Sequence, residues 1–133
     1  MIIYKKDYIN IAYYEAEKLL EITWLAYASS AAYREAMLQY IEALQKYEIK
    51  RWLADYRQAR VVRLSDQEWT REVWSALFFQ QSQQLEKVAR VKSSDISARI
   101  SFENMFRYID QSQLPYGFME FEFYGEARNW LLA

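Results

Sequence analysis

Charged side chains lie at and beyond the carboxyl end of residues 50–56, a short and mostly apolar run that is typical of a strand buried on both faces. Asp55 and Arg57 are two residues apart, so on a strand they would share a face and could reach one ligand. Arg60 and Arg63 follow closely. Because open α/β sheets bind ligands at the carboxyl ends of their strands, these four residues predict a site for a small anion. The alternative is an ion pair between Asp55 and Arg57 that only closes the strand.

Ser65 opens the run Ser65-Asp66-Gln67-Glu68, in which a serine precedes a glutamate by three positions. This spacing is typical of a capping box, where the hydroxyl group accepts a bond from a helix N–H and the glutamate reaches back. We interpret Ser65 as a helix cap, which contributes about 1 kcal/mol. The alternative is a phosphorylation site, since a phosphate would be favoured at a helix N-terminus.

Trp74, Phe78 and Phe79 lie partly outside the apolar face of a predicted helix. That face is traced by Trp69, Val73, Ala76 and Leu77. Three large apolar groups beside a core stripe indicate either a very wide buried face or a contact surface. Read as a contact surface, they predict a homodimer with this helix in its interface, because twofold dimers are the commonest oligomers.

The chain has no cysteine and no histidine. Disulfides, thiolate metal sites, thiol nucleophiles and histidine-based acid–base catalysis are therefore excluded. Acidic pairs such as Glu120 and Glu122 alternate along one strand and are expected to face water. We expect a protein that is not an enzyme and that has no metal site and no cofactor.

The charge balance argues against a nucleic-acid partner. There are 17 basic and 18 acidic residues, a formal net charge of −1, whereas nucleic-acid binding depends on a basic excess or stripe. The N-terminus lacks the apolar stretch of a signal peptide, and no run approaches the roughly 20 apolar residues of a membrane span. We expect a cytoplasmic protein without an integral membrane segment.

Hydrophobic periodicity predicts the elements that must position these residues. Residues 8–14 alternate, and after a polar break Leu20, Ile22 and Trp24 alternate as well, which predicts an antiparallel hairpin. Three more strands are predicted at residues 50–56, 87–91 and 119–123, each separated from the next by a helical pattern. Ser93 or Ser94 would cap the third helix, with Ile96, Ile100, Ile109 and the Met105-Phe106 pair on its apolar side.

The predicted fold is a single α/β domain of residues 1–133. It has a mixed five-stranded sheet whose first strand is antiparallel, with four helices and right-handed crossovers between the parallel strands. The residues expected in the core are Leu20, Ile22, Trp52, Leu53, Ala54, Val73, Leu77 and Phe121.

Several local sequences carry a resemblance to a known family. They are the opening Tyr-Ile-Asn-Ile, the second strand ending in Trp24, the run Trp52-Leu53-Ala54-Asp55-Tyr56-Arg57, and the closing Phe123-Tyr124-Gly125-Glu126-Ala127-Arg128-Asn129-Trp130-Leu131. With the order of the elements, they resemble the SpoIIAA-like proteins, the STAS-type domain of bacterial anti-sigma-factor antagonists. The likeness runs nearly end to end and looks closest to small, stand-alone members.

The resemblance implies a curved sheet built as a (βα)4 superhelix, and regulatory work without catalysis. Its members switch protein–protein contacts, and some relatives bind anionic or lipid-like ligands. In the antagonists, a serine in the turn before the second helix is phosphorylated. The matching residues here, Arg63-Leu64-Ser65-Asp66-Gln67, keep the serine but lack the glycine and the preceding aspartate of that turn.

Two functions follow as hypotheses. The first is a regulatory module that acts through protein contacts, with a protein partner that the sequence does not name. The second is a carrier or sensor of a small anionic or lipid-like ligand bound at the strand ends. An enclosed apolar cavity lined by Trp and Tyr side chains would favour the carrier, whereas a flat exposed aromatic patch would favour the interaction module.

Overall fold

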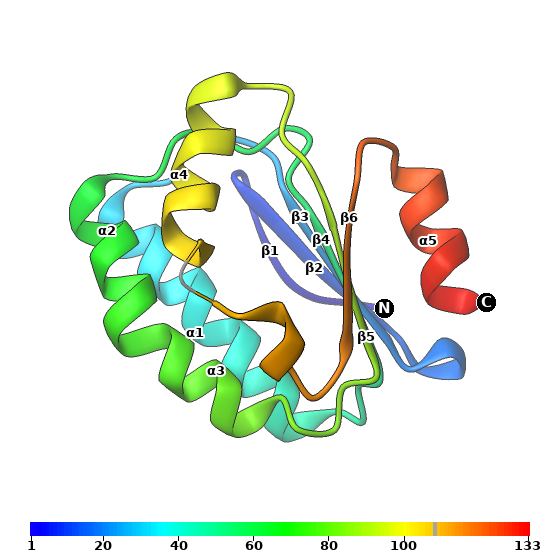
Figure 1. The fold of residues 1–133 in the computed structure, drawn as a ribbon. Helices are drawn as coiled ribbons and strands as arrows, with labels where there is room; N and C mark the ends of the chain where they lie inside the picture. Colours follow the sequence, from blue (N-terminus) through cyan, green and yellow to red (C-terminus); the bar gives the residue numbers. More distant parts are fainter. Residues whose placement is uncertain (108) are drawn as a thin grey trace.

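The computed structural model describes residues 1–107 and 109–133, which form one mixed sheet with helices on both faces (Figure 1). The strands are β1 (Ile2–Lys6), β2 (Ile9–Tyr14), β3 (Leu19–Trp24), β4 (Arg51–Asp55), β5 (Lys87–Val91) and β6 (Gly117–Phe121). The α-helices are α1 (Ser30–Lys46), α2 (Leu64–Trp69), α3 (Ser75–Gln81), α4 (Ile96–Phe106) and α5 (Tyr124–Leu132).

The strands lie in the sheet in the same order as in the chain. β1, β2 and β3 form an antiparallel meander, in which Ile11 of β2 pairs with Ile22 of β3. From β3 to β6 every neighbouring pair is parallel. The predicted hairpin is therefore confirmed, and so is the mixed α/β class.

The predicted number of five strands is wrong, because the described residues form six. Strand β1 was missed. It lies at the sheet edge, its residues are exposed or only half buried, and it pairs with β2 through an irregular register between Ile2 and Tyr4. An edge strand of this kind owes its stability to backbone pairing with its neighbour rather than to a buried apolar pattern, so its sequence carries little periodic signal.

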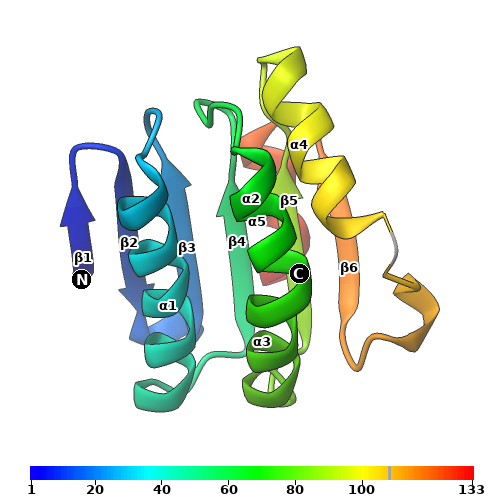
Figure 2. The same cartoon turned by 90° about the vertical axis from the view of Figure 1, so that its left-hand side faces the viewer.

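Helices α1 to α4 cover one face of the sheet, and α5 packs on the other face (Figures 1 and 2). The alternation of side chains along β4 explains both layers, since successive side chains point to opposite faces of a sheet. Trp52 and Ala54 belong to the core beneath α1 to α4, whereas Leu53 belongs to the smaller cluster beneath α5. A sheet buried on both faces requires β4 to be apolar almost throughout.

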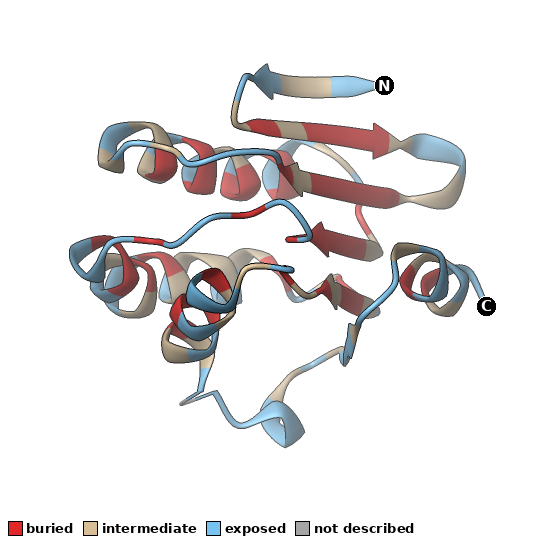
Figure 3. Ribbon diagram, turned by 90° about the horizontal axis from the view of Figure 1, so that it is seen from above, coloured by how far each residue is buried: buried red, intermediate tan, exposed pale blue. Residues whose placement is uncertain are grey.

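Most of the predicted core residues are buried. Leu20, Ile22, Trp52, Leu53 and Ala54 are all below a tenth exposed. Seen from above, the buried residues gather in the central strands and on the helix faces turned toward the sheet (Figure 3). Three predicted core residues are not buried: Leu77 and Phe121 are half-buried, and Val73 is exposed.

The exposure of Val73 has a specific cause in the backbone. Between α2 and α3 the helix makes a π-helical turn, Thr70–Trp74, in which the N–H of Ser75 bonds to the carbonyl of Thr70 five residues earlier. A π turn adds one residue and rotates everything after it relative to a regular helix. Trp74 therefore faces the sheet in place of Val73. Because α2, the π turn and α3 are continuous, the described residues form four helices, as predicted.

Helix α4 begins at a different cap from those predicted, and only Met105 and Phe106 of its predicted apolar side pack in or against the core. The cap is Asp95, whose carboxylate accepts a hydrogen bond from the N–H of Ser97, rather than Ser93 or Ser94. Ile96, Ile100 and Ile109 are exposed. The buried residues of this helix are Ala98, Ser101, Phe102 and Met105. They repeat at the same three- and four-residue spacing, so periodicity alone did not separate the two faces.

We predict that Trp74→Ala lowers the free energy of unfolding by roughly 3–5 kcal/mol, the usual cost of deleting a buried tryptophan. The indole N–H of Trp74 also donates to the carbonyl of Met37 at 2.7 Å, and this bond would be lost. Val73→Ala is the matched control and should cost less than about 1 kcal/mol. Urea denaturation measures both. A larger loss for Val73→Ala would show that the phase of the helix after the π turn is wrong.

Candidate functional site

Asp55 and Arg57 meet at the end of β4, as predicted, but they bind each other. The guanidinium of Arg57 donates hydrogen bonds to both carboxylate oxygens of Asp55, with Nε 2.9 Å from Oδ1 and an Nη 2.7 Å from Oδ2. The backbone N–H of Arg57 also donates to Oδ1 at 3.1 Å. The same guanidinium lies over the ring of Tyr124 in α5, 4.7 Å from its centroid. Asp55 is buried, so this pair neutralises a charge that would otherwise be costly there.

Arg60 and Arg63 contact residues other than Asp55 and Arg57. Arg60 lies 3.9 Å from a carboxylate oxygen of Asp95, and Arg63 donates a 2.8 Å hydrogen bond to the hydroxyl of Tyr27. The pocket between them has a volume of only about 20 Å³, which is room for one water molecule. The structure therefore does not bring the four predicted anion-binding residues together around one ligand.

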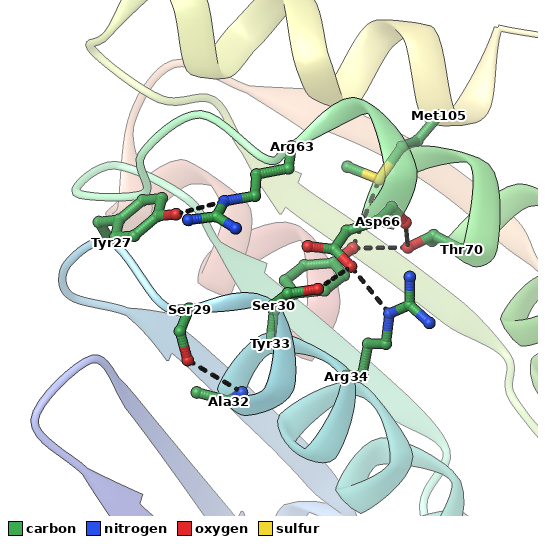
Figure 4. A network of polar contacts seen from close by, with 10 residues as sticks. All are labelled: Tyr27, Ser29, Ser30, Ala32, Tyr33, Arg34, Arg63, Asp66, Thr70 and Met105. Carbon is green, nitrogen blue, oxygen red and sulfur yellow. Dashed lines mark hydrogen bonds and ion pairs between the residues drawn. The ribbon is translucent and has the colours of Figure 1, made fainter.

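A polar network beside these arginines joins α1, α2 and α4 (Figure 4). The buried carboxylate of Asp66 accepts hydrogen bonds from the hydroxyl of Ser30 at 2.6 Å and from Nε of Arg34 at 2.8 Å. The hydroxyl of Tyr33 lies 2.7 Å from that of Thr70 and donates to the sulfur of Met105. Because these groups satisfy one another, we interpret the network as a clamp between helices.

Ser65 does not cap α2, so the predicted capping box is wrong. The helix begins at Leu64, with Arg63 in the cap position and no side-chain cap bond. The N–H groups of Asp66 and Gln67 instead bond to the carbonyl of Arg63, and Ser65 is exposed in the first turn. Sequence spacing matched the motif, but the helix cap lies at Arg63, two residues before Ser65. Phosphorylation of Ser65 stays a prediction.

The three aromatic residues predicted to form one exposed surface are not alike. Trp74 is buried and Phe78 is partly buried, and their rings stack with centroids 4.8 Å apart. Only Phe79 is exposed, at 55%. The proposed interface is wrong for Trp74, because the π turn rotates it into the core. The homodimer stays a prediction, now without the patch that motivated it.

A cavity of about 370 Å³ lies between the sheet and helices α3 and α4. The axes of α3 and α4 diverge from the top of the molecule to the bottom, and the segment leading to β6 passes beside them (Figure 2). The residues lining this cavity include Trp52 and Ala54 of β4, Val88 and Arg90 of β5, Trp74 and Phe78 of the helix before β5, Phe106 of α4, and Phe118 and Glu120 of β6.

The walls of this cavity are mainly aromatic. The ring of Trp52 meets those of Tyr40 and Phe78 edge to face, at centroid distances of 5.5 and 5.2 Å. Tyr56 stacks on Phe102 at 4.1 Å. These ring contacts position the aromatic side chains of the cavity wall against one another. The cavity lies under the helices rather than at the strand ends where the sequence predicted a ligand.

The charged group deepest in this wall is Arg90, whose side chain is only 13% exposed. Its guanidinium lies over the rings of Phe106 and Phe118, 5.0 and 5.1 Å from their centroids. Its Nε is 3.3 Å from a carboxylate oxygen of Glu120, the residue opposite it on β6. Arg90 thus combines a positive charge, a fixed orientation and access to an apolar chamber.

Sequence reasoning missed Arg90, although a signal was present. The run Lys87–Val91 is apolar except at its first and fourth residues. Val88 and Arg90 alternate on one face of a strand that has helices on both sides. A charged residue at an inward-facing position is costly to bury unless it is paired or used. A charged residue at an inward-facing position of a central strand is therefore a signal for a functional residue, and Arg90 carries that signal.

The described part of the chain contains no cluster of three or more acidic, histidine or cysteine side chains that could hold a metal ion. Among the same residues, no helix has both the length and the apolar run needed to cross a membrane. No protein-family model, no curated protein and no solved structure matches this chain.

Ser29→Ala should lower the free energy of unfolding by about 1 kcal/mol, whereas Ser65→Ala should change it by less than about 0.5 kcal/mol. Ser29 is the cap of α1, and its hydroxyl accepts from the N–H of Ala32 at 3.3 Å. Urea denaturation of the two variants side by side makes the comparison. Equal losses would contradict the observed start of α2.

Stability should fall as the pH rises above about 10, the ordinary pKa of tyrosine. Burial raises the pKa of Tyr33, Tyr40 and Tyr56 above that value. Between the unfolded and folded pKa values the unfolded chain has released protons that the folded chain still holds, so alkali favours unfolding. Below pH 10 these three groups are protonated in both states and add no pH dependence.

Tyrosinate absorbance and circular dichroism, followed together during an alkaline titration, test this prediction. Exposed tyrosines should ionise while the circular dichroism remains native, and the three buried ones should ionise only with unfolding. Ionisation of every tyrosine near pH 10 in a folded protein would contradict the burial of these residues.

Proposed function

We propose that this chain is a non-enzymatic binding module that carries or senses a small, largely apolar molecule in the cavity beneath α3 and α4. The observation that carries the proposal is the size and lining of that cavity, about 370 Å³ with aromatic walls. Ligand sites in proteins are typically 300–1,000 Å³, mostly apolar, with a small number of polar groups that orient the ligand.

The apolar lining of this cavity supports the proposal. The cavity opens to solvent, since exposed residues such as Phe79 and Ile109 form part of its lining. Apolar surface in contact with water is unfavourable, by roughly 25 cal/mol per Å². A bound apolar molecule would remove this surface from water.

The absence of catalytic residue types supports a role without chemistry. The chain has neither histidine nor cysteine. Four charged residues line the cavity, Arg90, Glu103, Arg107 and Glu120, of which Arg90 and Glu120 contact each other; the other lining residues are aromatic, aliphatic or uncharged polar. Binding, rather than acid–base or nucleophilic catalysis, is what such a lining can perform.

The relationship to the SpoIIAA-like proteins belongs to the same proposal. It is supported by the antiparallel hairpin of β2 and β3, followed by parallel strands with intervening helices. A cytoplasmic location is proposed with it, and the absence of cysteine is compatible with that compartment.

Regulation through protein contacts is the second candidate function, and one observation favours it. Val61, Leu64, Ile96 and Ile100 are exposed by 45%, 72%, 73% and 52%. Val61 lies in the connection into α2, Leu64 is the first residue of α2, and Ile96 and Ile100 lie on α4. The two segments are joined by the hydrogen bond from the N–H of Val62 to the hydroxyl of Ser101. Exposed aliphatic groups on neighbouring segments are a feature of interaction sites.

Nile red, a neutral and largely apolar dye, should bind this protein with increased fluorescence. Ala54→Leu should weaken that binding about tenfold, because the added carbon atoms project from β4 into the cavity. The fold should persist, since the new side chain fills space rather than displacing neighbours. Ala76→Leu is the matched control: Ala76 is exposed on α3, so this variant should bind like the wild type.

Fluorescence titration measures the affinities, and urea denaturation verifies that the variants fold. Absence of dye binding, or equal binding by Ala54→Leu and the wild type, would contradict a ligand site in the cavity. Protein contact through the exposed aliphatic residues of α2 and α4 would then be the favoured function.

A further inference from the structure

We infer that the molecule held in this cavity carries a carboxylate group, and that Arg90 binds it. The inference rests on the proposed function, because it assigns a polar group to a ligand whose apolar body occupies the aromatic chamber. It concerns a different part of the cavity, the wall formed by β5 and β6.

The environment of Arg90 fixes how its guanidinium can be used. Phe106 and Phe118 lie against it at 5.0 and 5.1 Å, so two aromatic rings take up its stacking contacts. Glu120 contacts only Nε, at 3.3 Å. Within the described residues, neither Nη atom has a hydrogen-bond partner. What remains is a pair of N–H donors at the wall of the cavity, in a group that two rings prevent from turning.

A carboxylate fits that pair of donors better than other small polar groups. Its two oxygens accept two parallel N–H bonds from a guanidinium, which gives both charge pairing and a fixed angle. Glu120 does not already fill this role, because it contacts a single nitrogen and its side chain is 36% exposed. A buried cation with part of its donor capacity unused favours an anionic ligand group.

Tyr56 supplies a further donor at the same place. It is buried, and it lines both the large cavity and a small adjoining pocket of about 20 Å³ that Arg90 also lines. Its hydroxyl forms no hydrogen bond within the described part of the chain. Burial raises the pKa of Tyr56, so the hydroxyl keeps its proton and can donate it to an oxygen of the ligand.

The charges around this point balance one another and leave an anion unopposed by any net negative charge. The adjoining pocket is lined by three cationic side chains, Arg90, Lys92 and Arg99, and by two carboxylates, Glu103 and Glu120. Lys92 and Arg99 both contact Glu122, at 3.8 and 2.9 Å. Counted with Glu122, the three cations are balanced by three carboxylates, so this side is distinguished by the donors of Tyr56 and Arg90 rather than by an excess of charge.

Two probes with the same ring system separate the carboxylate from the apolar body. 2-Naphthoic acid is an anion at neutral pH, and 2-naphthalenemethanol is its neutral counterpart. Isothermal titration calorimetry at neutral pH should show the acid binding about tenfold more tightly than the alcohol, the lower range for hydrogen bonds to charged groups. The acid should lose this advantage in high salt only in part, because its partner is mostly buried.

Variants of Arg90 and Glu120 then identify the partner. Arg90→Gln should weaken the acid about tenfold and change the alcohol less than about twofold. Glu120→Gln should strengthen the acid, because it removes a competing carboxylate. Arg63→Gln is the matched control, since it deletes an exposed arginine at the strand ends, outside the residues that line the cavity. It should bind both probes like the wild type.

The outcomes distinguish this inference from the proposed function. Equal affinity for acid and alcohol, or a loss of both on Arg90→Gln in a folded protein, would overturn the carboxylate assignment while leaving the cavity as a ligand site. Failure of both probes and of Nile red would remove the proposed function itself. If Arg90→Gln does not fold, the Glu120→Gln variant decides alone: an unchanged or weaker affinity for the acid overturns the inference.

Discussion

Strand β4 packs against a helical layer on each of its two faces, with alternate side chains on each face. Much of the structure depends on this double burial. Trp52 and Ala54 face the layer of α1 to α4, while Leu53 and Asp55 face the layer of α5. On one face the large indole of Trp52 lies beside the small methyl group of Ala54, and both residues line the cavity. On the other face, an apolar residue is followed by a buried charge that requires a partner.

The requirement at Asp55 organises the α5 side of the molecule. Arg57 neutralises the carboxylate and at the same time covers the ring of Tyr124, the first residue of α5. The hydroxyl of Tyr124 in turn donates to Glu21 of β3. At the other end of α5, Arg51 and Lys87 donate to the carbonyls of Leu131 and Trp130. Cations are favoured at a helix C-terminus, where carbonyl groups lack partners. A short helix is thus held at both ends by the sheet.

On the opposite face, two features determine how the helices pack on the sheet. The π turn rotates Trp74 onto the sheet, where it packs with Tyr40 and Phe78. Helix α4 lies near α2 at its beginning, where its buried residues are Ala98 and Ser101, and lies farther from α3 at its end. The space between them is the cavity. Its aromatic walls and its arginine therefore arise from the same packing that builds the core.

The amino-acid sequence by itself determined the α/β class, the antiparallel hairpin, the parallel strands and the burial of β4, because these depend on local periodicity and on the handedness of strand–helix–strand units. It also placed Asp55 beside Arg57, two positions apart on one strand. Only the tertiary structure decided which arginines would be engaged by other residues, that Ser65 would not cap its helix, and that Trp74 would replace Val73 in the core. The physical reason is that a single extra residue in a helical turn, or a helix start displaced by two positions, changes where the neighbouring side chains lie. Such a shift is selected by packing between distant segments, which leaves no periodic signal in the sequence.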